Sequence, residues 1–530
     1  MQERQPPRET VDNEVRRDME SRKIDVDRSL AILDNYNAGA YDSIEKVIAE
    51  DIPSIDGETI VDMTGDVSLT LPAGEAKRRI EELLPGVNPE EHGTWTDSQG
   101  HFDRSELARL GERLLPLVSY GVLNGGSATS YADTKKNSTL SNELLSLLRE
   151  DFDAVAGSPR GKAKGITPAF VNPDGSFGPS FLELKMRALL IRVLRYNLRY
   201  GAPADATPPG APFFQMTSVY NDEEIAHAYT TYRHSPFLAD LIRETGVVVT
   251  EAETGIQPMI AAYTHSDEGR PKRIFTRAYG REGETLPLPG GHGQNFDILR
   301  EVYAGLHRRG KRFVYLGNVD NLGFTVDPVS VAYLALTGKQ AAFDFAFRTP
   351  VDVKGGILVR DRHGGLNAAD IGPAISPDEV FRREEEGKNI LFNCATGLFN
   401  LDYLVPNIDY VVENLPMRFS DQDKDAGKYS QAEQVTWEIV GMLDDFLVFG
   451  VDKYERFLAA KVLLETLMTS GLKLDDPGYP TDERPDRDLR GTAGKLHDGL
   501  KRKLVGEYGM SLEKGRWIPK SVDRLTAEPG

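Results

Sequence analysis

Short apolar runs that end abruptly in polar turn residues recur along this chain. The clearest covers residues 313–316 and gives way at once to the polar turn 317–321. Runs at 117–122, 213–216 and 247–249 end in the same way, and stretches with apolar residues at helical spacing separate them. This alternation predicts a doubly wound α/β fold around a mostly parallel sheet. Ligands of such sheets bind beyond the carboxyl ends of the strands, so the polar turns form the candidate functional site.

Local signals predict further elements of both kinds. A serine followed three residues later by a glutamate, the capping box that starts helices, occurs twice. Apolar alternation marks strands, and paired glycines mark tight turns. These signals predict a helix from Ser180 and Glu183, a helix from Ser430 and Glu433 to about residues 444–445, strands at 341–347 and 447–451, a hairpin at 352–365 whose far strand covers 356–361, and a helical insertion at 137–160.

The length of the chain, 530 residues, exceeds what one hydrophobic core usually supports, so two or three domains are expected. The pattern suggests a loose tail at 1–24, a mostly helical N-terminal region at 25–115, a catalytic domain at 116–460 and a small C-terminal region at 461–530. Apolar runs of membrane-spanning length and a signal-peptide core are both missing, so cytoplasmic residence is expected. Cys394 is the only cysteine, which excludes an intrachain disulfide and a multi-cysteine zinc site.

Charge narrows the choice of partners. The net charge of −19 argues against nucleic acid and against an anionic membrane surface. An anionic substrate therefore needs a cationic pocket or a metal ion. Asp320, fixed at the end of a strand, has the chemistry of a Mg²⁺ ligand, because Mg²⁺ prefers oxygen donors and takes further ligands from substrate phosphates. The alternative is that the Asp320 carboxylate only accepts backbone N–H groups in an Asx turn.

A glycine-rich segment follows the predicted strand at 117–122. Residues 123–136 read LNGGSATSYADTKK, and the backbone N–H groups around Gly125 and Gly126 can form a concave anion site that suits a nucleoside triphosphate. An ordinary tight turn is the alternative interpretation of the glycine pair. A nicotinamide-dependent Rossmann enzyme is disfavoured, because no GxGxxG motif opens a helix after an early strand.

Taken in order, these strand ends resemble the uridylyltransferases that make UDP-sugars, above all the UTP–glucose-1-phosphate uridylyltransferase (UDP-glucose pyrophosphorylase) family. The resemblance covers about residues 118–461 and implies a Rossmann-like nucleotide-diphospho-sugar transferase domain of GT-A-like type. It rests on seven motifs: LNGGSATS at 123–130, MTSVYNDEE at 216–224, PGGHG at 289–293, NVDNLG at 318–323, DVKGG at 352–356, LFNCATGLFNLDYL at 391–404 and ERFLAAK at 455–461.

The resemblance also implies a set of site residues. The nucleotide is expected near the glycine-rich segment, Mg²⁺ at Asp320, and the sugar phosphate at the later motifs. The implied contacts are Leu123, Asn124, Gly125, Gly126, Gly293 and Asp320 for the nucleotide, His292, Lys354 and Asn393 for the sugar phosphate, and Lys164, Lys461 and Asp320 for catalysis.

Two departures from the family pattern concern the glycine-rich segment. The loop lysine of the family has two possible counterparts: Lys164, which precedes a family-like ITPAF segment, or the pair Lys135 and Lys136. We prefer Lys164, which makes 137–160 an insertion inside the phosphate loop and a possible lid over the nucleotide. Ala128 replaces a loop glycine, and a backbone with positive φ would be strained there. The family's uracil-contacting glutamine has no clear match at 253–257.

The implied reaction joins UTP and glucose 1-phosphate into UDP-glucose and pyrophosphate. An oxygen of the sugar phosphate attacks the α-phosphorus of UTP with the help of Mg²⁺ and lysines. A UDP-N-acetylglucosamine pyrophosphorylase and a broad UDP-sugar pyrophosphorylase remain alternatives within this class. Ala128 and Ala132 in the loop leave open a different class, a UDP-sugar-binding protein without activity. The sequence does not specify the oligomeric state.

Overall fold

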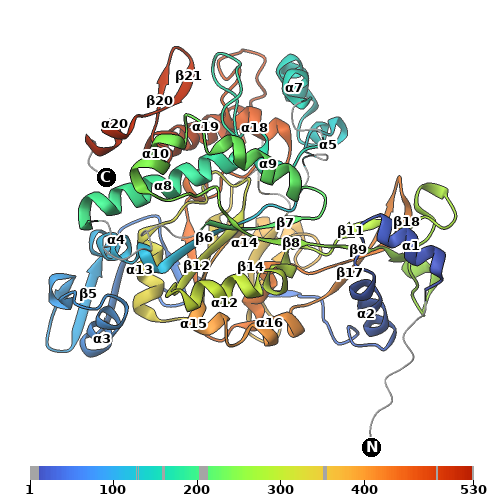
Figure 1. Ribbon diagram of the computed structural model, residues 1–530, viewed down its shortest axis with the longest axis horizontal. Coiled ribbons are helices and arrows are strands. Elements are labelled where there is room, and N and C mark those ends of the chain that lie inside the picture. Colours follow the sequence, from blue (N-terminus) through green and yellow to red (C-terminus); the bar gives the residue numbers. More distant parts are fainter. Residues whose placement is uncertain are drawn as a thin grey trace, which may run out of the picture.

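A mixed β-sheet runs through the centre of the protein (Figure 1). The computed structural model describes residues 11–126, 128, 131–157, 161–201, 213–349, 352, 355–484 and 488–527. Neighbouring strands of its main path are parallel, except that β16 is antiparallel to both β12 and β13. In spatial order the strands are β2 (Ile60–Asp62), β19 (Phe446–Val451), β13 (Ala341–Phe347), β16 (Leu391–Asn400), β12 (Phe313–Asn318), β6 (Val118–Leu123), β7 (Phe213–Ser218) and β8 (Glu253–Gln257).

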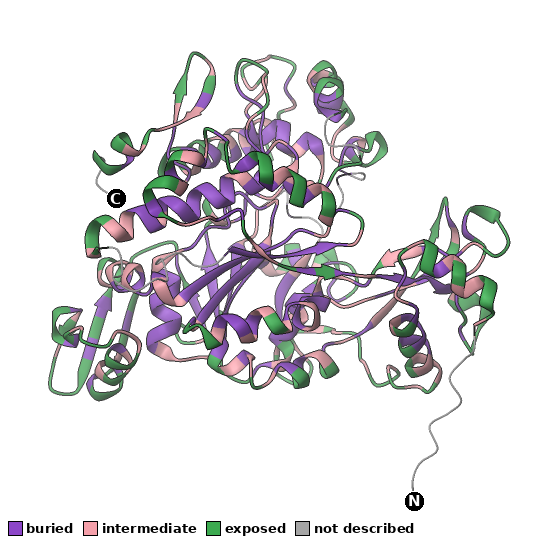
Figure 2. Cartoon of the chain, viewed as in Figure 1, coloured by how far each residue is buried: buried purple, intermediate pink, exposed green. Residues whose placement is uncertain are grey.

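Helices cover both faces of this sheet, and the strands are buried on both sides (Figure 2). Alternate residues of β12 enter two separate cores: Phe313 and Tyr315 belong to one, Val314 and Leu316 to the other. Burial on both faces explains why the strands read as continuous apolar runs. The first core contains α4 (Arg104–Arg113), α8 (Phe181–Tyr200) and α13 (Pro328–Thr337), and the second contains α11 (Asn295–Ile298), α12 (Arg300–Arg308), α15 (Leu401–Leu404) and α16 (Ile408–Asn414). The predicted α/β fold with a mixed sheet is confirmed.

The first capping box is confirmed and the second is wrong. Ser180 and Glu183 cap α8 reciprocally. Ser430, in contrast, lies inside strand β18 (Gly427–Glu433), which pairs with β17 (Arg418–Lys424), and only the 3-10 helix η7 (Thr436–Met442) follows. The hydroxyl of Ser430 accepts a hydrogen bond of 2.8 Å from Nζ of Lys272 instead of capping a helix. Pairing in a sheet therefore overrode the local helix signal.

Two smaller predictions also need correction. Residues 247–249 form no strand but lead into a turn, and the next strand is the sheet edge β8. Three apolar residues make too short a run to define a strand; here Val249 is buried in loop packing. The strand predicted at 356–361 exists as β14 (Gly356–Asp361), but its hairpin partner is the following strand β15 (Leu366–Asp370).

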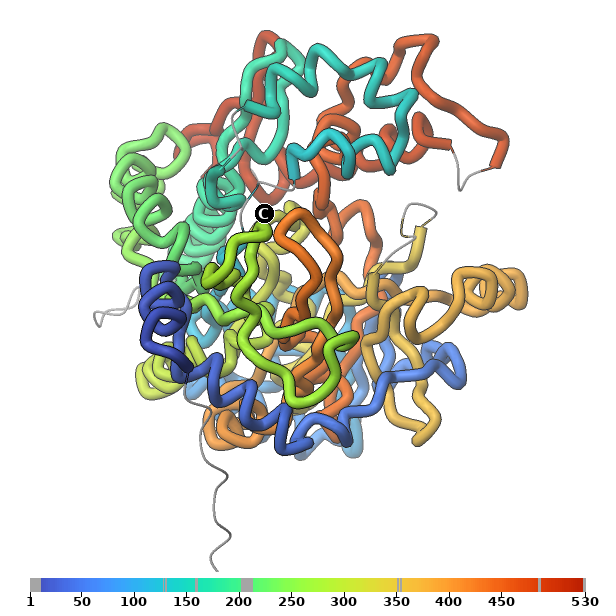
Figure 3. The backbone as a smooth tube through the Cα atoms, turned by 90° about the vertical axis from the view of Figure 1, so that its right-hand side faces the viewer, coloured from blue at the N-terminus to red at the C-terminus, as the bar shows by residue number. Residues whose placement is uncertain are grey.

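The N-terminal region combines helices with short strands. Strand β1 (Ala49–Asp51) pairs with β14 and β2 pairs with β19, so this region adds to the central sheet. Helices α1 (Asn13–Ser21) and α2 (Val26–Asn37) share a core with β9 (Met259–Ala261), and Figure 3 shows this blue segment beside the green one. Helix α3 (Ala73–Leu83) lies against a small sheet of β3 (Ser68–Pro72), β4 (Thr94–Trp95) and β5 (Gln99–Asp103).

The helical character predicted for 137–160 is confirmed: α6 (Asn142–Leu147) and α7 (Arg149–Ala156) lie within this range, and α5 (Thr134–Ser138) overlaps its start. Residues of α6 and α7 share one hydrophobic core with α18 (Leu463–Thr469) and the start of α19 (Leu489–Gly506). The insertion therefore packs against the C-terminal part of the chain, which continues through β20 (Met510–Glu513), β21 (Arg516–Pro519) and α20 (Val522–Ala527). Within the described residues, every helix falls short of the length and apolarity that crossing a membrane requires.

Candidate functional site

Three stretches that lie far apart in the sequence meet at Asp320. Its carboxylate, just beyond β12, forms an ion pair with Nζ of Lys164, which lies in the short 3-10 helix η3 (Lys164–Ile166). The same Nζ donates a hydrogen bond of 2.7 Å to the carbonyl of Ala460, the residue before Lys461. Both charged side chains are largely buried, with 14% and 15% of their surface exposed. The structure thus brings together two of the residues that the sequence assigned to one site, Lys164 and Asp320, next to the residue that precedes Lys461.

The glycine-rich segment runs beside this cluster. The backbone N–H of Lys164 donates a hydrogen bond of 3.1 Å to the carbonyl of Gly126. Lys135 and Lys136 instead lie exposed on α5. Of the three candidate loop lysines, Lys164 is therefore the one that contacts both Asp320 and the glycine-rich segment.

Ala128 is accommodated without the expected strain. Its N–H donates a hydrogen bond of 2.9 Å to the carbonyl of Lys162, its side chain is fully buried, and its φ is not positive. An alanine therefore fits at the position where the family has a glycine. Ser127, Thr129 and Ser130 lie outside the described residues.

Asn321 fastens the Asp320 turn to the later segment, a role that the sequence analysis missed. Its side-chain oxygen accepts hydrogen bonds from the N–H groups of Leu458 at 3.0 Å and Gly323 at 2.9 Å, and its Nδ2 donates to the carbonyl of Arg456 at 3.0 Å. A Cβ atom built on Gly323 would lie 2.3 Å from the carbonyl carbon of Arg456, so only glycine permits this approach. The Asn-Leu-Gly pattern after Asp320 was the available signal.

The back of the same turn is held by buried polar groups. Lys185 of α8, 1% exposed, donates hydrogen bonds from Nζ to the carbonyls of Asn321 and of Phe324, the latter at 2.7 Å. The hydroxyl of Tyr508 donates to the carbonyl of Leu322 at 2.7 Å. Burial lowers the pKa of Lys185 well below its usual range, and the negative charge of Asp320 acts in the opposite direction. These contacts fix the backbone on which the Asp320 carboxylate is carried.

Lys461 and Asn393 lie near one another through Phe392. The ammonium group of Lys461 is 5.9 Å from the ring centroid of Phe392, and its backbone N–H donates to the carboxylate of Glu465 at 2.5 Å. The side-chain oxygen of Asn393 accepts a hydrogen bond of 2.8 Å from the N–H of Ala395, which has a positive φ of 50° in a bulged part of β16.

Lys354 lies outside the described residues, but the glycines that follow it are described. A Cβ atom on Gly355 would lie 2.5 Å from the ring of Phe392, and one on Gly356 would lie 3.7 Å from Cβ of Asn393. The DVKGG motif therefore adjoins the segment that contains Asn393.

The opposite end of the site begins where β6 ends. Leu123 is the last residue of β6, and the N–H of Asn124 donates a hydrogen bond of 2.8 Å to the carbonyl of Met216 in β7. The carbonyl of Asn124 accepts one of 3.1 Å from Nδ2 of Asn221. The glycine-rich segment thus starts from a backbone fixed by the neighbouring strand.

Gln257, at the carboxyl end of β8, joins this segment to the PGGHG loop. A Cβ atom on Gly125 would lie 3.3 Å from Oε1 of Gln257. Nε2 of Gln257 donates hydrogen bonds of 2.7 Å to the carbonyl of Gly291 and of 2.9 Å to Oε1 of Gln294. A glutamine therefore does lie beside the nucleotide segment, where the sequence alone gave no clear match.

His292 is held as a neutral ring. Its Nδ1 accepts a hydrogen bond of 3.1 Å from the N–H of Thr436, and burial lowers the pKa of His292 to about 4. The N–H of Gly293 donates to the carbonyl of Gln434 at 2.8 Å, and a Cβ atom on Gly293 would lie 2.7 Å from the carbonyl carbon of Gln434. Close packing against the Gln434 backbone is thus sufficient to require glycine at position 293.

The donor set suits a divalent ion only in part. Among the described residues there is no group of three or more His, Cys, Asp or Glu side chains that could hold a metal. Asp320 provides one carboxylate at the edge of the sheet, beside a lysine that is suited to phosphate. This arrangement fits a Mg²⁺ ion that takes its remaining ligands from phosphate oxygens and water.

Comparisons with known proteins agree with the motifs. The model of the UTP–glucose-1-phosphate uridylyltransferase family matches residues 273–472. A probable UTP–glucose-1-phosphate uridylyltransferase of Schizosaccharomyces pombe is 25% identical over 396 residues, which cover 72% of this chain and 71% of the relative. The UTP–glucose-1-phosphate uridylyltransferase of Solanum tuberosum is 29% identical over 210 residues, 38% of this chain and 42% of that protein.

Solved structures share the fold at low identity. A UDP-N-acetylglucosamine pyrophosphorylase from Trypanosoma brucei in complex with an inhibitor has a TM-score of 0.52 at 17% identity, over 76% of this chain and 69% of that chain. A mutant UDP-glucose pyrophosphorylase from Leishmania major in complex with UDP-glucose has a TM-score of 0.52 at 15% identity, over 90% and 82% of the two chains. The family model and the curated relatives therefore show that this chain is similar to UTP–glucose-1-phosphate uridylyltransferases, and the solved structures show that it shares their fold.

Proposed function

We propose that this protein forms UDP-glucose and pyrophosphate from UTP and glucose 1-phosphate. The observation that carries the proposal is the cluster of Lys164, Asp320 and Ala460, which places the Lys461 segment beside a carboxylate and a lysine. Two polyanions must approach one another in this reaction, and such a cluster offsets their repulsion.

The reaction needs positioning and charge neutralisation more than proton transfer. A phosphate monoester has its second pKa near 6, so the attacking oxygen of glucose 1-phosphate is already largely ionised at neutral pH. Lys164 and Lys461 bind the phosphates and stabilise the charge that develops on the departing pyrophosphate. Asp320, together with phosphate oxygens, would hold a Mg²⁺ ion, and that ion would supply further charge neutralisation.

The ammonium group of Lys164 is already held in position before substrate binds. The Asp320 carboxylate and the Ala460 carbonyl hold it, so it needs little rearrangement to meet an incoming phosphate. A cation already fixed in position costs less ordering when substrate binds. The buried contacts of Lys185 behind the turn contribute to the same rigidity.

The neutral end of the site receives the uridine. Backbone groups of Leu123, Asn124, Gly125, Gly126 and Gly293 border the nucleotide. Oε1 of Gln257 supplies an acceptor for the N–H of the uracil ring, since Nε2 already donates to Gly291 and Gln294. His292, Lys354 and Asn393 face the hexose and its phosphate. This division assigns the uncharged base to backbone and side-chain amides, and the phosphates to lysines and Asp320.

The proposal extends to the architecture. The catalytic domain covers 116–460 and has a GT-A-like, Rossmann-like layout, with an N-terminal region at 25–115 and a small C-terminal region at 461–530. The insertion at 137–160 acts as a lid over the nucleotide, and the core that it shares with α18 makes the lid and the Lys461 segment move together. The protein works in the cytoplasm.

Initial rates of pyrophosphate release test the proposal. The full chain with UTP and Mg²⁺ is supplied with glucose, galactose or N-acetylglucosamine 1-phosphate, and we expect the highest kcat/KM with glucose 1-phosphate. A clear preference for the acetylated sugar would favour the UDP-N-acetylglucosamine enzyme, and similar values for all three would favour a broad UDP-sugar pyrophosphorylase. Saturable UDP-glucose binding without any pyrophosphate release would instead show a binding protein.

A further inference from the structure

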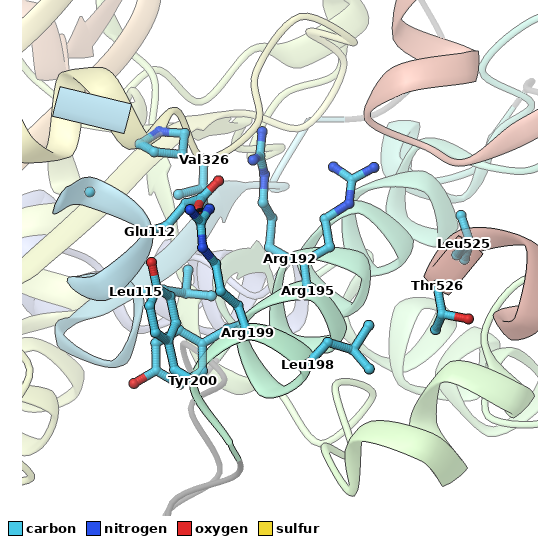
Figure 4. Close-up of a pocket in the computed structure, with 13 residues that line it drawn as sticks. Glu112, Leu115, Arg192, Arg195, Leu198, Arg199, Tyr200, Val326, Leu525 and Thr526 are labelled. Atoms are coloured by element: carbon cyan, nitrogen blue, oxygen red, sulfur yellow. Dashed lines mark hydrogen bonds and ion pairs between the residues drawn. The ribbon is translucent and has the colours of Figure 1, made fainter. Parts of the chain in front are cut away.

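A cavity of about 250 Å³ lies away from the candidate site, along the C-terminal half of α8 (Figure 4). Helix α4, the segment that leads into α13, and α20 complete its walls. Three arginines of α8, namely Arg192, Arg195 and Arg199, line it at intervals of three and four residues, so they share one helix face. Glu112 is the only carboxylate among the lining residues. An excess of positive charge is notable in a chain whose net charge is −19.

One of these arginines has a guanidinium group that is only partly hydrogen-bonded. Arg192 binds both carboxylate oxygens of Glu507 through Nη2, at 3.0 Å and 2.9 Å, while its buried Nε–H has no hydrogen-bond partner among the described residues. A buried N–H without a partner costs free energy until an acceptor arrives. Arg199 pairs with Glu112 at 2.6 Å at the exposed rim of the cavity.

Two tyrosines and several aliphatic side chains line the rest of the cavity. The rings of Tyr196 and Tyr200 have centroids 5.1 Å apart, and Leu115, Val326 and Pro328 add apolar surface. A dry apolar cavity of about 150 Å³ holds benzene, so the present volume suits one ring with one charged group attached. The combination of guanidinium groups with tyrosine rings favours an anion on a planar body.

The cavity is joined to the Asp320 turn by a short chain of contacts. Arg192 holds Glu507, and the next residue, Tyr508, donates its hydroxyl hydrogen bond to the carbonyl of Leu322, two residues after Asp320. Val326, which lines the cavity, continues the same turn. An anion that competes with Glu507 for Arg192 therefore acts on the backbone that carries Asp320.

We propose that this cavity is a binding site for a small aromatic anion, a single ring that bears a phosphate or a carboxylate, and that its occupation changes turnover at the Asp320 site. The second part rests on the proposed uridylyltransferase activity, whereas binding itself does not. A ligand of about ten heavy atoms that fits well is expected to bind with a Kd of about 0.1 to 1 mM.

Calorimetric titration of the full chain tests the site. The probes are phenyl phosphate, phenylacetate, inorganic phosphate and neutral benzyl alcohol, each titrated with UDP-glucose present to occupy the catalytic site. We expect saturable binding of one of the aromatic anions, with the phosphate and carboxylate arms deciding between the two charged groups. Failure of both aromatic anions to bind overturns the proposal, and so does equally tight binding of benzyl alcohol.

Matched variants identify where the probe binds. Arg195→Gln and Arg199→Gln are each expected to weaken the aromatic anion at least about tenfold, as expected for the loss of a charged hydrogen bond, and Tyr196→Leu should weaken it while sparing inorganic phosphate. Arg308→Gln, an exposed arginine of α12, is the control that should change nothing. Binding that is lost in Lys164→Gln but unaffected by Arg195→Gln and Arg199→Gln would place the probe in the catalytic site and overturn the proposal.

The effect on turnover is measured separately. Saturating probe should change kcat for UDP-glucose formation in the wild type, and this change should disappear in Arg195→Gln. Binding that leaves kcat unaltered would overturn the coupling. Absence of any UDP-glucose formation would overturn the proposed function, and the calorimetric result would still decide the site.

Discussion

At both ends of the candidate site, a loop is held in place by hydrogen bonds to a much later segment of the chain. One end is charged and the other is uncharged. At one end, the Asp320 turn is fastened to residues 456–459 by the side chain of Asn321. At the other, the PGGHG loop is fastened to residues 434–436 by backbone contacts of Gly293 and the side chain of Thr436. In both cases a loop beyond the sheet is bound to a segment more than a hundred residues later.

What differs is the charge that each fastened loop presents. The first end brings Lys164 and Asp320 together beside Ala460, the residue before Lys461, whereas the second presents amides and a histidine whose pKa is lowered to about 4. Phosphates need the first environment, because their repulsion must be offset. An uncharged base is better served by the second, where no ion must be desolvated. The hydrogen bonds that hold each loop are therefore separable from the side chains that meet the substrate, and substitutions can test the two independently.

We expect the largest effect from Asp320→Asn, which removes a charged group that we assign to the reaction. The amide keeps the size of the side chain but removes both the partner of Lys164 and the proposed Mg²⁺ ligand. We expect kcat for UDP-glucose formation to fall by about 10³-fold, as for the loss of a major electrostatic group. Steady-state pyrophosphate release, with circular dichroism to check folding, measures it.

The matched control is Asp66→Asn, an exposed acid in the N-terminal region. It should leave kcat within about twofold of wild type, since surface substitutions are usually close to neutral. Near-normal Mg²⁺-dependent rates in Asp320→Asn would remove Asp320 from the reacting site.

Asn321→Ala tests the scaffold instead of the chemistry. It removes three hydrogen bonds of a fully buried side chain and leaves the N–H of Leu458 and the carbonyl of Arg456 without this partner. At about 1 kcal/mol for each bond, the free energy of unfolding should fall by about 3 kcal/mol. Urea denaturation followed by circular dichroism provides the value.

Asn414→Ala offers a control of the same type, because Asn414 is exposed and its side chain donates a local hydrogen bond of 2.8 Å to the carbonyl of Tyr410. Its unfolding free energy should stay within about 0.5 kcal/mol of wild type. If both variants lose the same free energy of unfolding, the attachment of the Asp320 turn to residues 456–459 does not depend on Asn321.

Much of this scaffold was predictable from sequence, because it depends on local order. The strands at 341–347 and 356–361 and the helix from Ser180 follow from alternation and capping. The failures at 247–249 and at Ser430 have one cause: tertiary pairing decides between elements when a run is short. The choice of β15 as the partner of β14 was likewise set by the neighbouring chain and not by the residues of β14.

For the candidate site, sequence reasoning found the residues that end strands and missed those that hold them. Asp320 and Gly125 follow apolar runs, so their positions carry a signal. Asn321 and Lys185 act through backbone carbonyls of distant segments, and a single sequence has no pattern for such partners. Gln257 became interpretable only when the structure placed it against Gly125.

Lys164→Gln sharpens the chemical half of the comparison. It removes the cation that contacts Asp320 and Ala460 while leaving a side chain that can still donate a hydrogen bond. We expect kcat/KM for UTP to fall by about 10²-fold, the cost of one electrostatic donor. Lys162→Gln, an exposed lysine two residues earlier, should be unaffected. An equal loss in both variants would mean that the segment, and not the Lys164 charge, matters.

We expect the smallest effect at the uncharged end of the site, where the free energy of unfolding should depend on pH through His292. Because the folded pKa of His292 is about 4, below the usual value near 6.5, the stability it contributes is complete above pH 6.5 and declines as the pH falls toward 4. At pH 5.5 this loss amounts to about 1.4 kcal/mol. His292→Gln has no such titration, so its stability should fall less than that of wild type between pH 7.5 and 5.5. Parallel pH profiles of the two proteins, measured by urea denaturation, would show that the His292 ring is not held neutral and would remove the contrast between the two ends.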